Sequence, residues 1–287
     1  METTKKIRLF RVDGKDGVKP LTSVHVLDLE KKISEGTVQM RVLDFNDVEH
    51  SMCFNPVQYR YLPRLEDCMT LSRNIICNAF EGKDGFYQKA SSNFLAAVLH
   101  FFVNYERHPY DKCGSLSDMP HVLSFLNHDY EQIFEVLKTD AEAFPLLAPF
   151  ITAYDNKAME QLEGMIGTLR VHISRLATKE AYWVLHHGND DFVLRNEDET
   201  SYVAIVSAVN LDKLYSALAL NTSNILDSIE ISPDKDGINR ILSITRYSFL
   251  SKQERDDILQ KNFQRVINDI DLMVSRIIGN KSKQKYT

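Results

Sequence analysis

Several features that would identify an exported or metal-binding protein are scarce in this sequence. Its four cysteines, Cys53, Cys68, Cys77 and Cys113, form no Cys-x-x-Cys pair and have no spacing typical of metal ligands. We therefore expect the reduced, mostly packed thiols of a cytosolic protein. No run of about 18 apolar residues occurs, so no segment is expected to span a membrane. The first residues also include no apolar region typical of a secretory signal.

A phosphate-binding loop is missing as well. Such a loop needs a glycine-rich turn that ends in Gly-Lys-Ser/Thr, because its backbone N–H groups surround the phosphates. The nearest sequences, Gly14-Lys15-Asp16 and Gly82-Lys83-Asp84, have an acid in place of the hydroxyl that would coordinate magnesium. The segment Val24–Glu30 resembles a Walker B strand, but without a lysine loop we interpret it as a strand that ends in an acidic turn.

Other catalytic patterns are equally scarce. No Gly-x-Ser-x-Gly motif occurs, and no motif pairs a cysteine with a histidine. His186 and His187 lie close in sequence to Asp190 and Asp191. Adjacent side chains on a strand point to opposite faces, however, so the two histidines would not converge on one ion. The sequence therefore predicts no catalytic residue, no cofactor and no metal site.

The composition is that of an ordinary globular protein. The 287 residues are 44% apolar and 26% charged, which suffices for a sizeable core. With 34 basic and 40 acidic side chains, the formal net charge is -6. This mild acidity argues against a protein that binds nucleic acid along a basic surface, and we expect no sequence-specific nucleic-acid binding.

Residues 1–54 alternate between apolar and polar side chains, which favours half-buried antiparallel strands. The expected strands are Ile7–Val12, Val24–Leu29 and Val38–Leu43. We therefore interpret residues 1–54 as an N-terminal β-rich segment.

Between residues 55 and 180 the apolar residues recur with the period of helices, which predicts an all-α domain. One helix is expected over residues 64–80. The next, over residues 86–105, is apolar on nearly all sides, which indicates a central, buried helix.

Signals for helix starts follow in series. Ser117 or Asp118 is expected to cap a helix that has Pro120 in its first turn. Asp129 with Gln132 has the spacing of a capping box for the next helix. Thr139 and Glu142 have the spacing of a capping box, so a third start is expected there.

A long helix is expected to begin at Asp155 or Asn156. Gly164 and Gly167 lie three residues apart in it. Such a pair indicates close packing against a neighbouring helix, with a ligand contact as the alternative.

Residues 181–231 are expected to return to strands and then to a helix. The strands are Tyr182–Leu185, Asp191–Leu194 and Tyr202–Val206, and the helix covers residues 211–229.

The last part of the chain begins with a linker at residues 232–250, where Ser232–Gly237 carries strong turn signals. Residues 251–287 are expected to form an amphipathic helix over Lys252–Ile278 and a basic tail that frays from Gly279.

Several short runs, in this order and at these intervals, together resemble the coupling proteins of conjugative type IV secretion systems, in the branch carried by conjugative transposons. They cover roughly residues 50–226. The runs are Phe86–Ala90, Asn93–Ala97, Pro120–Val122, Leu126–Glu131, Gln161–Gly164, Tyr182–Leu185 and Tyr215–Leu220.

In that family the corresponding stretch is an all-α domain inserted in a RecA-like motor, with the strands and helix that lead back into the motor. The Walker A loop lies upstream of the pair that Asn55-Pro56 resembles, and the Walker B strand follows the helix that Tyr215–Leu220 resembles. Neither has a counterpart here, whereas Asn262–Val266 is similar to the family's C-terminal helix. The implied fold class is α+β, mostly α: an all-α helical domain seated on a small, incomplete RecA-like sheet, plus a long C-terminal helix.

The resemblance implies a non-catalytic component of conjugative DNA transfer. Its helical domain would recognise a relaxase or another secretion substrate, or other coupling-protein subunits. We expect a cytoplasmic protein, with peripheral attachment to the inner membrane through a secretion complex. By position, the residues nearest the recognition role are Tyr110, Asp111, Lys112, His128, Tyr130 and Glu131.

Two further hypotheses stay open at this point. The chain could be the helical-lobe subunit of a P-loop ATPase whose nucleotide site lies on another chain. It could instead be a regulatory or decayed fragment that acts by protein–protein interaction. Activity that appears only on mixing with a P-loop partner would support the first of these.

Overall fold

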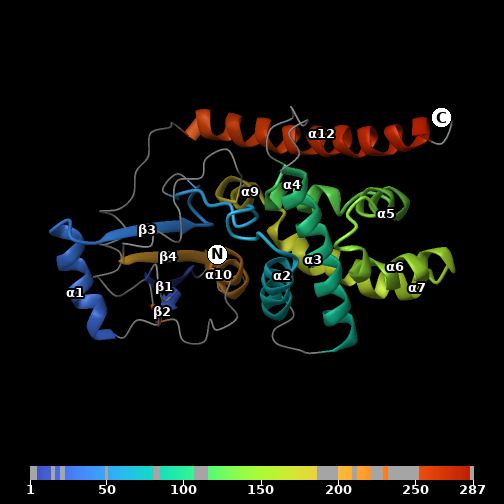
Figure 1. Cartoon of the computed structure of the whole chain (residues 1–287). Helices are drawn as coiled ribbons and strands as arrows, with labels where there is room; N and C mark the ends of the chain where they lie inside the picture. Colours follow the sequence, from blue (N-terminus) through green and yellow to red (C-terminus); the bar gives the residue numbers. More distant parts are fainter. Residues whose placement is uncertain are drawn as a thin grey trace.

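Figure 1 shows a computed structural model of the chain. The structure describes residues 5–13, 17–19, 23–48, 51–79, 85–106, 116–185, 200–208, 212–220, 229–231 and 252–284. This part of the chain is mostly helical and contains one small sheet, which confirms an α+β fold dominated by helices. The sheet lies at one end with α1, helix α10 lies between the sheet and the other helices, and the long C-terminal helix α12 lies along one side of the helical part (Figure 1).

The sheet has the strand order β2-β1-β4-β3, and the short strand β5 also pairs with β1. Strand β1 runs antiparallel to β2, β4 and β5, whereas β3 runs parallel to β4. The antiparallel pairing expected for the strands of residues 1–54 was therefore wrong for β3. The whole helical domain lies between β3 and β4 in sequence, and a connection of that length lets a strand return in the same direction. The strands are β1 (Lys5–Asp13), β2 (Gly17–Lys19), β3 (Gln39–Asp44), β4 (Thr200–Ala208) and β5 (Ile229–Ile231).

Side chains alternate across the sheet and form two apolar layers. The layer that packs with α1 contains Ile7, Leu9, Leu29, Val42, Tyr202, Ala204 and Val206. The layer that joins the main core contains Phe10, Leu43, Val203 and Ile205, together with Leu214, Tyr215 and Leu218 of helix α10 (Asp212–Leu220). The sheet is thus covered on both faces.

The strand expected at Val24–Leu29 was wrong, because α1 (Ser23–Ser34) occupies that segment. Buried Leu29 and half-buried Ile33 are four residues apart and pack on the sheet from one helix face. Lys32 pairs with Asp28 across one turn, which also supports a helix. Over six residues the apolar pattern fits the period of a strand or that of a helix. Packing against the neighbouring sheet favours the helix.

Helix α3 (Phe86–Glu106) is the central helix of the main core, as its apolar composition predicts. Its Phe94 ring lies 5.0 Å from the ring of Phe150 and 6.4 Å from that of Phe134, measured between centroids. Its Phe102 ring lies 5.5 Å from that of Phe125. The helices around it are α2 (Leu65–Ala79), α4 (Met119–Phe125), α5 (Tyr130–Leu137) and α6 (Phe144–Asp155).

Only one of the two expected N-cap residues, Asp118 and Asp129, caps its helix through the side chain. Asp118 caps α4 through its side chain, with Pro120 in the first turn, which confirms that prediction. Asp129 occupies the N-cap position of α5, but its side chain makes no capping hydrogen bond.

The capping box expected at Thr139 and Glu142 was wrong. Asp140 instead accepts hydrogen bonds from the backbone N–H groups of Glu142 and Ala143, just before α6. Its other oxygen lies 2.6 Å from Nδ1 of buried His100 in α3. Burial raises the pKa of Asp140, but the hydrogen bond and charge of His100 and the backbone donors outweigh burial and lower it.

The strand expected at Tyr182–Leu185 was also wrong. Helix α9 (Lys179–Val184) lies there, and the Thr178 side chain caps it by accepting from the Ala181 N–H at 3.1 Å. The expected helix over residues 211–229 is confirmed only as α10, because Ile229 already belongs to β5. The expected strand Asp191–Leu194, the histidines at 186 and 187 and the linker at residues 232–250 lie outside the described residues.

Helix α12 (Lys252–Gln284) confirms the expected C-terminal helix. The fraying expected from Gly279 was wrong, since the helix continues to Gln284. Among the described helices, none is long and apolar enough to cross a membrane.

Candidate functional site

The candidate site surrounds an irregular turn in the helical segment that follows α6. Lys157 has a φ of 57°, in the left-handed region, and α6 ends just before it, so the long helix does not begin at Asp155 or Asn156 as expected. Helix α7 (Met159–Leu162) starts after this break.

A π-helical turn, Glu163–Gly167, follows α7 and leads into α8 (Thr168–Ile173). Such a turn contains one more residue than an α-helical turn and rotates the side chains that follow it. Single π-helical turns are frequent at functional sites.

The two glycines of the π turn have different surroundings. A Cβ atom on Gly164 would lie 2.7 Å from Cε1 of Tyr87 in α3, so the Tyr87 ring lies directly against the Gly164 backbone. This confirms the interpretation of close packing against a neighbouring helix for Gly164. A Cβ on Gly167 would meet only the flexible end of the Glu163 side chain.

Arg170 connects α8 to the start of α5. Its Nη2 donates a hydrogen bond of 2.8 Å to the backbone carbonyl of His128. Its guanidinium carbon lies 4.6 Å from the centroid of the Tyr130 ring, which is a cation–π arrangement. The Tyr130 phenol is buried, and burial together with the nearby Glu163 carboxylate raises the pKa of Tyr130 to about 12. The π turn and the N-terminus of α5 therefore form one connected unit.

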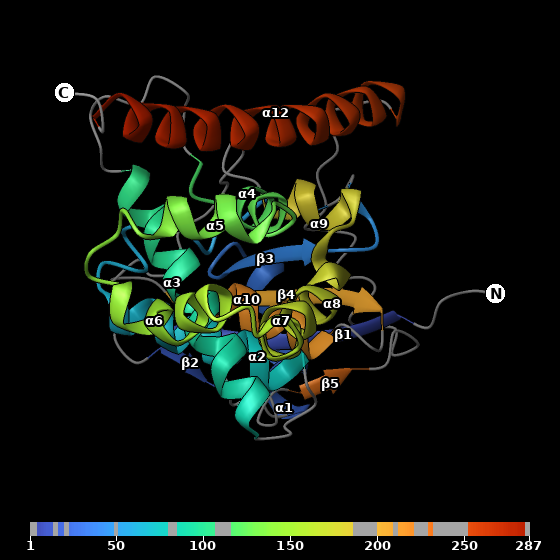
Figure 2. The same ribbon diagram turned by 90° about the vertical axis from the view of Figure 1, so that its right-hand side faces the viewer.

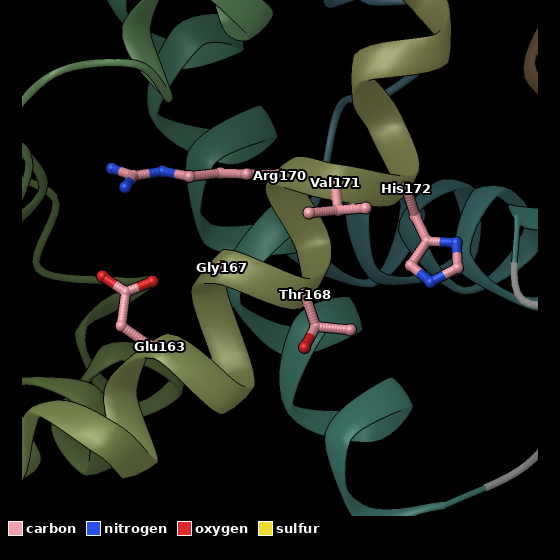
Figure 3. A pocket seen from close by; sticks show the side chains of 6 residues that line it. All are labelled: Glu163, Gly167, Thr168, Arg170, Val171 and His172. Carbon is pink, nitrogen blue, oxygen red and sulfur yellow. The ribbon is translucent and has the colours of Figure 1, made fainter.

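An open depression lies along the π turn and α8, as Figure 3 shows. Its volume is about 540 Å³, and Glu163, Gly167, Thr168, Arg170, Val171 and His172 line it. Arg170 and Glu163 extend toward one side, and Thr168 and His172 lie toward the other (Figure 3). Nδ1 of His172 lies 3.1 Å from the carbonyl oxygen of Ala79, which holds this side against α2. This depression is open to solvent. It therefore differs from the enclosed pockets in which small ligands are buried.

Large apolar side chains are exposed on the same helices. Val171 is 69% exposed, Phe86 is 63% exposed and Tyr87 is 49% exposed. The Phe86 and Tyr87 rings meet edge to face, with centroids 5.6 Å apart. Exposed aromatic and aliphatic groups are typical of surfaces that bind other proteins. We call Phe86, Tyr87, Glu163, Thr168 and Val171 the π-turn surface.

The residues expected from sequence to bind a partner have different positions. Tyr110, Asp111 and Lys112 lie outside the described residues. His128 contacts α12, since its Nε2 lies 3.1 Å from Oδ1 of Asp271. Tyr130 is buried beneath Arg170, whereas Glu131 is exposed in the first turn of α5. Partner binding by these residues stays a prediction.

Sequence reasoning did not identify Arg170, Glu163 or Val171 as parts of a site. The one signal that pointed to this segment was the pair Gly164 and Gly167, which indicated close packing. Phe86 and Tyr87 stood in a run that resembles a known family, but their exposure could not be read from the sequence.

The buried histidines of the described residues belong to the core. His100 pairs with Asp140, and Nδ1 of His121 lies 2.6 Å from Oδ1 of Asp118. Across the described part of the chain, no group of three or more histidine, cysteine or acidic side chains is arranged to hold a metal ion.

Comparisons with protein-family models, with curated proteins and with solved structures found no match to this chain. The function must therefore be inferred from the structure and from the resemblance noted in the sequence.

Because several tyrosines are buried, we expect the protein to unfold at alkaline pH. Burial raises the pKa of Tyr130, Tyr182 and Tyr215 to about 12 in each case, above the ordinary value of about 10. A raised folded-state pKa contributes stability that is complete below about pH 10 and is lost as the pH rises through about 12. We expect ultraviolet absorbance of tyrosinate to develop in two phases, the later one together with loss of the circular dichroism signal.

The variant Tyr215→Phe should make the later absorbance phase smaller. If all twelve tyrosines ionise before any loss of folded signal, the burial of these phenols is contradicted.

Proposed function

We propose that the chain is a non-catalytic, protein-recognising component related to the coupling proteins of conjugative type IV secretion systems. Its helical domain binds a relaxase or another secretion substrate protein. The resemblance of the sequence between roughly residues 50 and 226 supports the family assignment. The π-turn surface supports recognition of a protein.

The observation that carries this proposal is the combination of an open depression with exposed aromatic and aliphatic side chains on α3 and α8. Protein-binding surfaces are typically centred on such groups, and polar groups surround them. Here Val171 supplies the most exposed aliphatic group, and Glu163, Thr168 and Arg170 supply the polar surroundings. Arg170 is held by His128 and Tyr130, so this part of the surface is rigid before a partner arrives.

The sheet gives partial support to a relationship with RecA-like motors. Strands β3 and β4 are parallel, and helices cover both faces, as in sheets of that kind. The antiparallel pairing of β1 with β4 departs from the pattern. We propose that β3, β4 and α10 are the remnant of the motor. In this proposal β1 completes the sheet by pairing with β4 in the antiparallel direction.

The variant Val171→Asp tests the proposal. It places a charge on the exposed π-turn surface without removing a core side chain, so folding should be retained. We expect binding of a relaxase, or of a full-length coupling protein from the same genetic element, to weaken about tenfold or more, as for a residue central to an interface. Binding can be measured by surface plasmon resonance with the chain immobilised.

Leu272→Asp is the matched control, because Leu272 is 42% exposed and lies on α12, away from the π-turn surface. Its affinity should equal that of the unmodified chain. Equal affinities for Val171→Asp and the unmodified chain would show that another surface binds the partner. ATP hydrolysis that appears only on mixing with a P-loop protein would favour the ATPase-subunit hypothesis instead. Failure to bind any of these proteins would favour a decayed fragment.

A further inference from the structure

Helix α12 packs on the rest of the molecule through one face. It lies across α4, α5 and α9, and both views show it along a single side of the helical domain (Figures 1 and 2). Its solvent-facing positions include Gln264, Asn268, Leu272 and Ser275. The face that packs on the groove between α4, α5 and α9 contains the buried residues Leu259, Val266, Ile270, Met273 and Val274.

Directional contacts fix how α12 lies in this groove. The rings of Tyr182 in α9 and Phe263 in α12 have centroids 5.3 Å apart. Nε2 of His128 lies 3.1 Å from Oδ1 of Asp271, near the other end of the contact. The groove therefore binds the apolar face of α12, and these two contacts also fix the position of α12 along its own axis.

The attachment of α12 allows it to reach a second molecule. Residues 232–251 separate β5 from α12 in sequence. A segment of this length spans at most roughly 70 Å when fully extended, which exceeds the width of a small domain. The contacts in the groove are the same whether α12 comes from its own chain or from another copy.

We propose that α12 exchanges between two copies of this chain, so that the groove between α4, α5 and α9 receives α12 of a second copy. Mutual exchange gives a closed two-fold dimer, because each copy donates one helix and accepts one. Since no contact is gained or lost within the groove, the concentration of the chain sets the balance between monomer and dimer. This inference is independent of the proposed function.

Cysteine cross-linking between full-length copies tests the exchange. One population carries His128→Cys and another carries Asp271→Cys, both in a Cys77→Ser, Cys113→Ser background, so that only the buried Cys53 and Cys68 remain of the original cysteines. After mixing, a short bis-maleimide should produce a dimer-sized band on a denaturing gel. Replacing Asp271→Cys by Gln253→Cys is the control, because Gln253 is exposed on α12 and lies 18 residues, or roughly 27 Å along the helix axis, from Asp271. This mixture should give no band.

Light scattering after size exclusion gives a second readout with the unmodified chain. The dimer fraction should rise with concentration, and Val274→Asp should abolish it because Val274 is buried in the groove. A monomer at every concentration, with no band from the 128/271 mixture, would overturn the proposal and leave α12 docked in its own chain only. A dimer that Val274→Asp leaves intact, again without a band, would also overturn it, because the contact would then lie elsewhere.

Discussion

Replacing Phe94 with alanine should lower the free energy of unfolding by about 3–5 kcal/mol, which is the typical range for a fully buried phenylalanine. Phe94 has no exposed surface and lies between the rings of Phe134 and Phe150. The three side chains come from α3, α5 and α6, so the cavity would open where three helices meet. Urea unfolding followed by circular dichroism measures the loss.

Phe86→Ala is the matched control for this prediction. It makes the same substitution in the same helix, but Phe86 is 63% exposed. Its effect should stay within about 0.5 kcal/mol, as for surface positions in general. Similar losses for the two variants would contradict the placement of α3 as the central helix with Phe94 on its buried side.

The second large effect is expected from Asp118→Ala, at about 2–4 kcal/mol. The Asp118 carboxylate has no exposed surface and caps α4 by accepting from the backbone N–H of His121 at 2.9 Å. The same oxygen lies 2.6 Å from Nδ1 of His121, which is also buried. The substitution removes a helix cap and, in addition, takes a buried hydrogen-bond partner from an imidazole. Thermal and urea unfolding both measure the difference.

Asp129→Ala provides the comparison within the same protein. Asp129 occupies the N-cap position of α5, but it is exposed and its side chain makes no capping hydrogen bond. The expected loss is below about 0.5 kcal/mol. Equal destabilisation by Asp129→Ala and Asp118→Ala would contradict this explanation. The stabilisation by an N-cap residue would then depend on its position before the helix and not on the hydrogen bonds of its side chain.

Part of the fold could be predicted from the sequence because its signals are local and long. Helices α3 and α12 each repeat an apolar pattern over several turns, so only one period fits them. The strands Ile7–Val12 and Tyr202–Val206 are central in the sheet. The first places polar residues between apolar ones, and the second is a continuous apolar run, which is typical of a strand buried on both faces. The helix start before Pro120 is likewise a local signal, although only the structure shows that Asp118, and not Ser117, is the cap.

The incorrect predictions fall on short apolar segments. Val24–Leu29 mixes apolar and polar residues over six positions, and Tyr182–Leu185 is an apolar run of four residues. Segments this short fit a strand or a helix equally. In the structure, Leu29 packs on a sheet face, and Thr178 caps the second segment. Packing partners and a cap outside the segment decided both cases.

The candidate site could not be predicted as a site, because its parts come from distant positions in the chain. Arg170 reaches His128 and Tyr130, and Tyr87 lies against Gly164. No periodic pattern in the sequence encodes these pairs. The glycine pair indicated close packing, but only the structure shows which ring approaches and that the turn is π-helical.

The amino-acid sequence by itself determined the mostly helical composition, the central helix α3 and the long amphipathic helix α12, because backbone period and apolar spacing are properties of neighbouring residues. The tertiary structure alone decided that β3 runs parallel to β4, that the π turn presents an open surface, and that α12 lies in the groove between α4, α5 and α9. These features depend on contacts between residues far apart in the chain, whose free energies are defined only once the chain has folded.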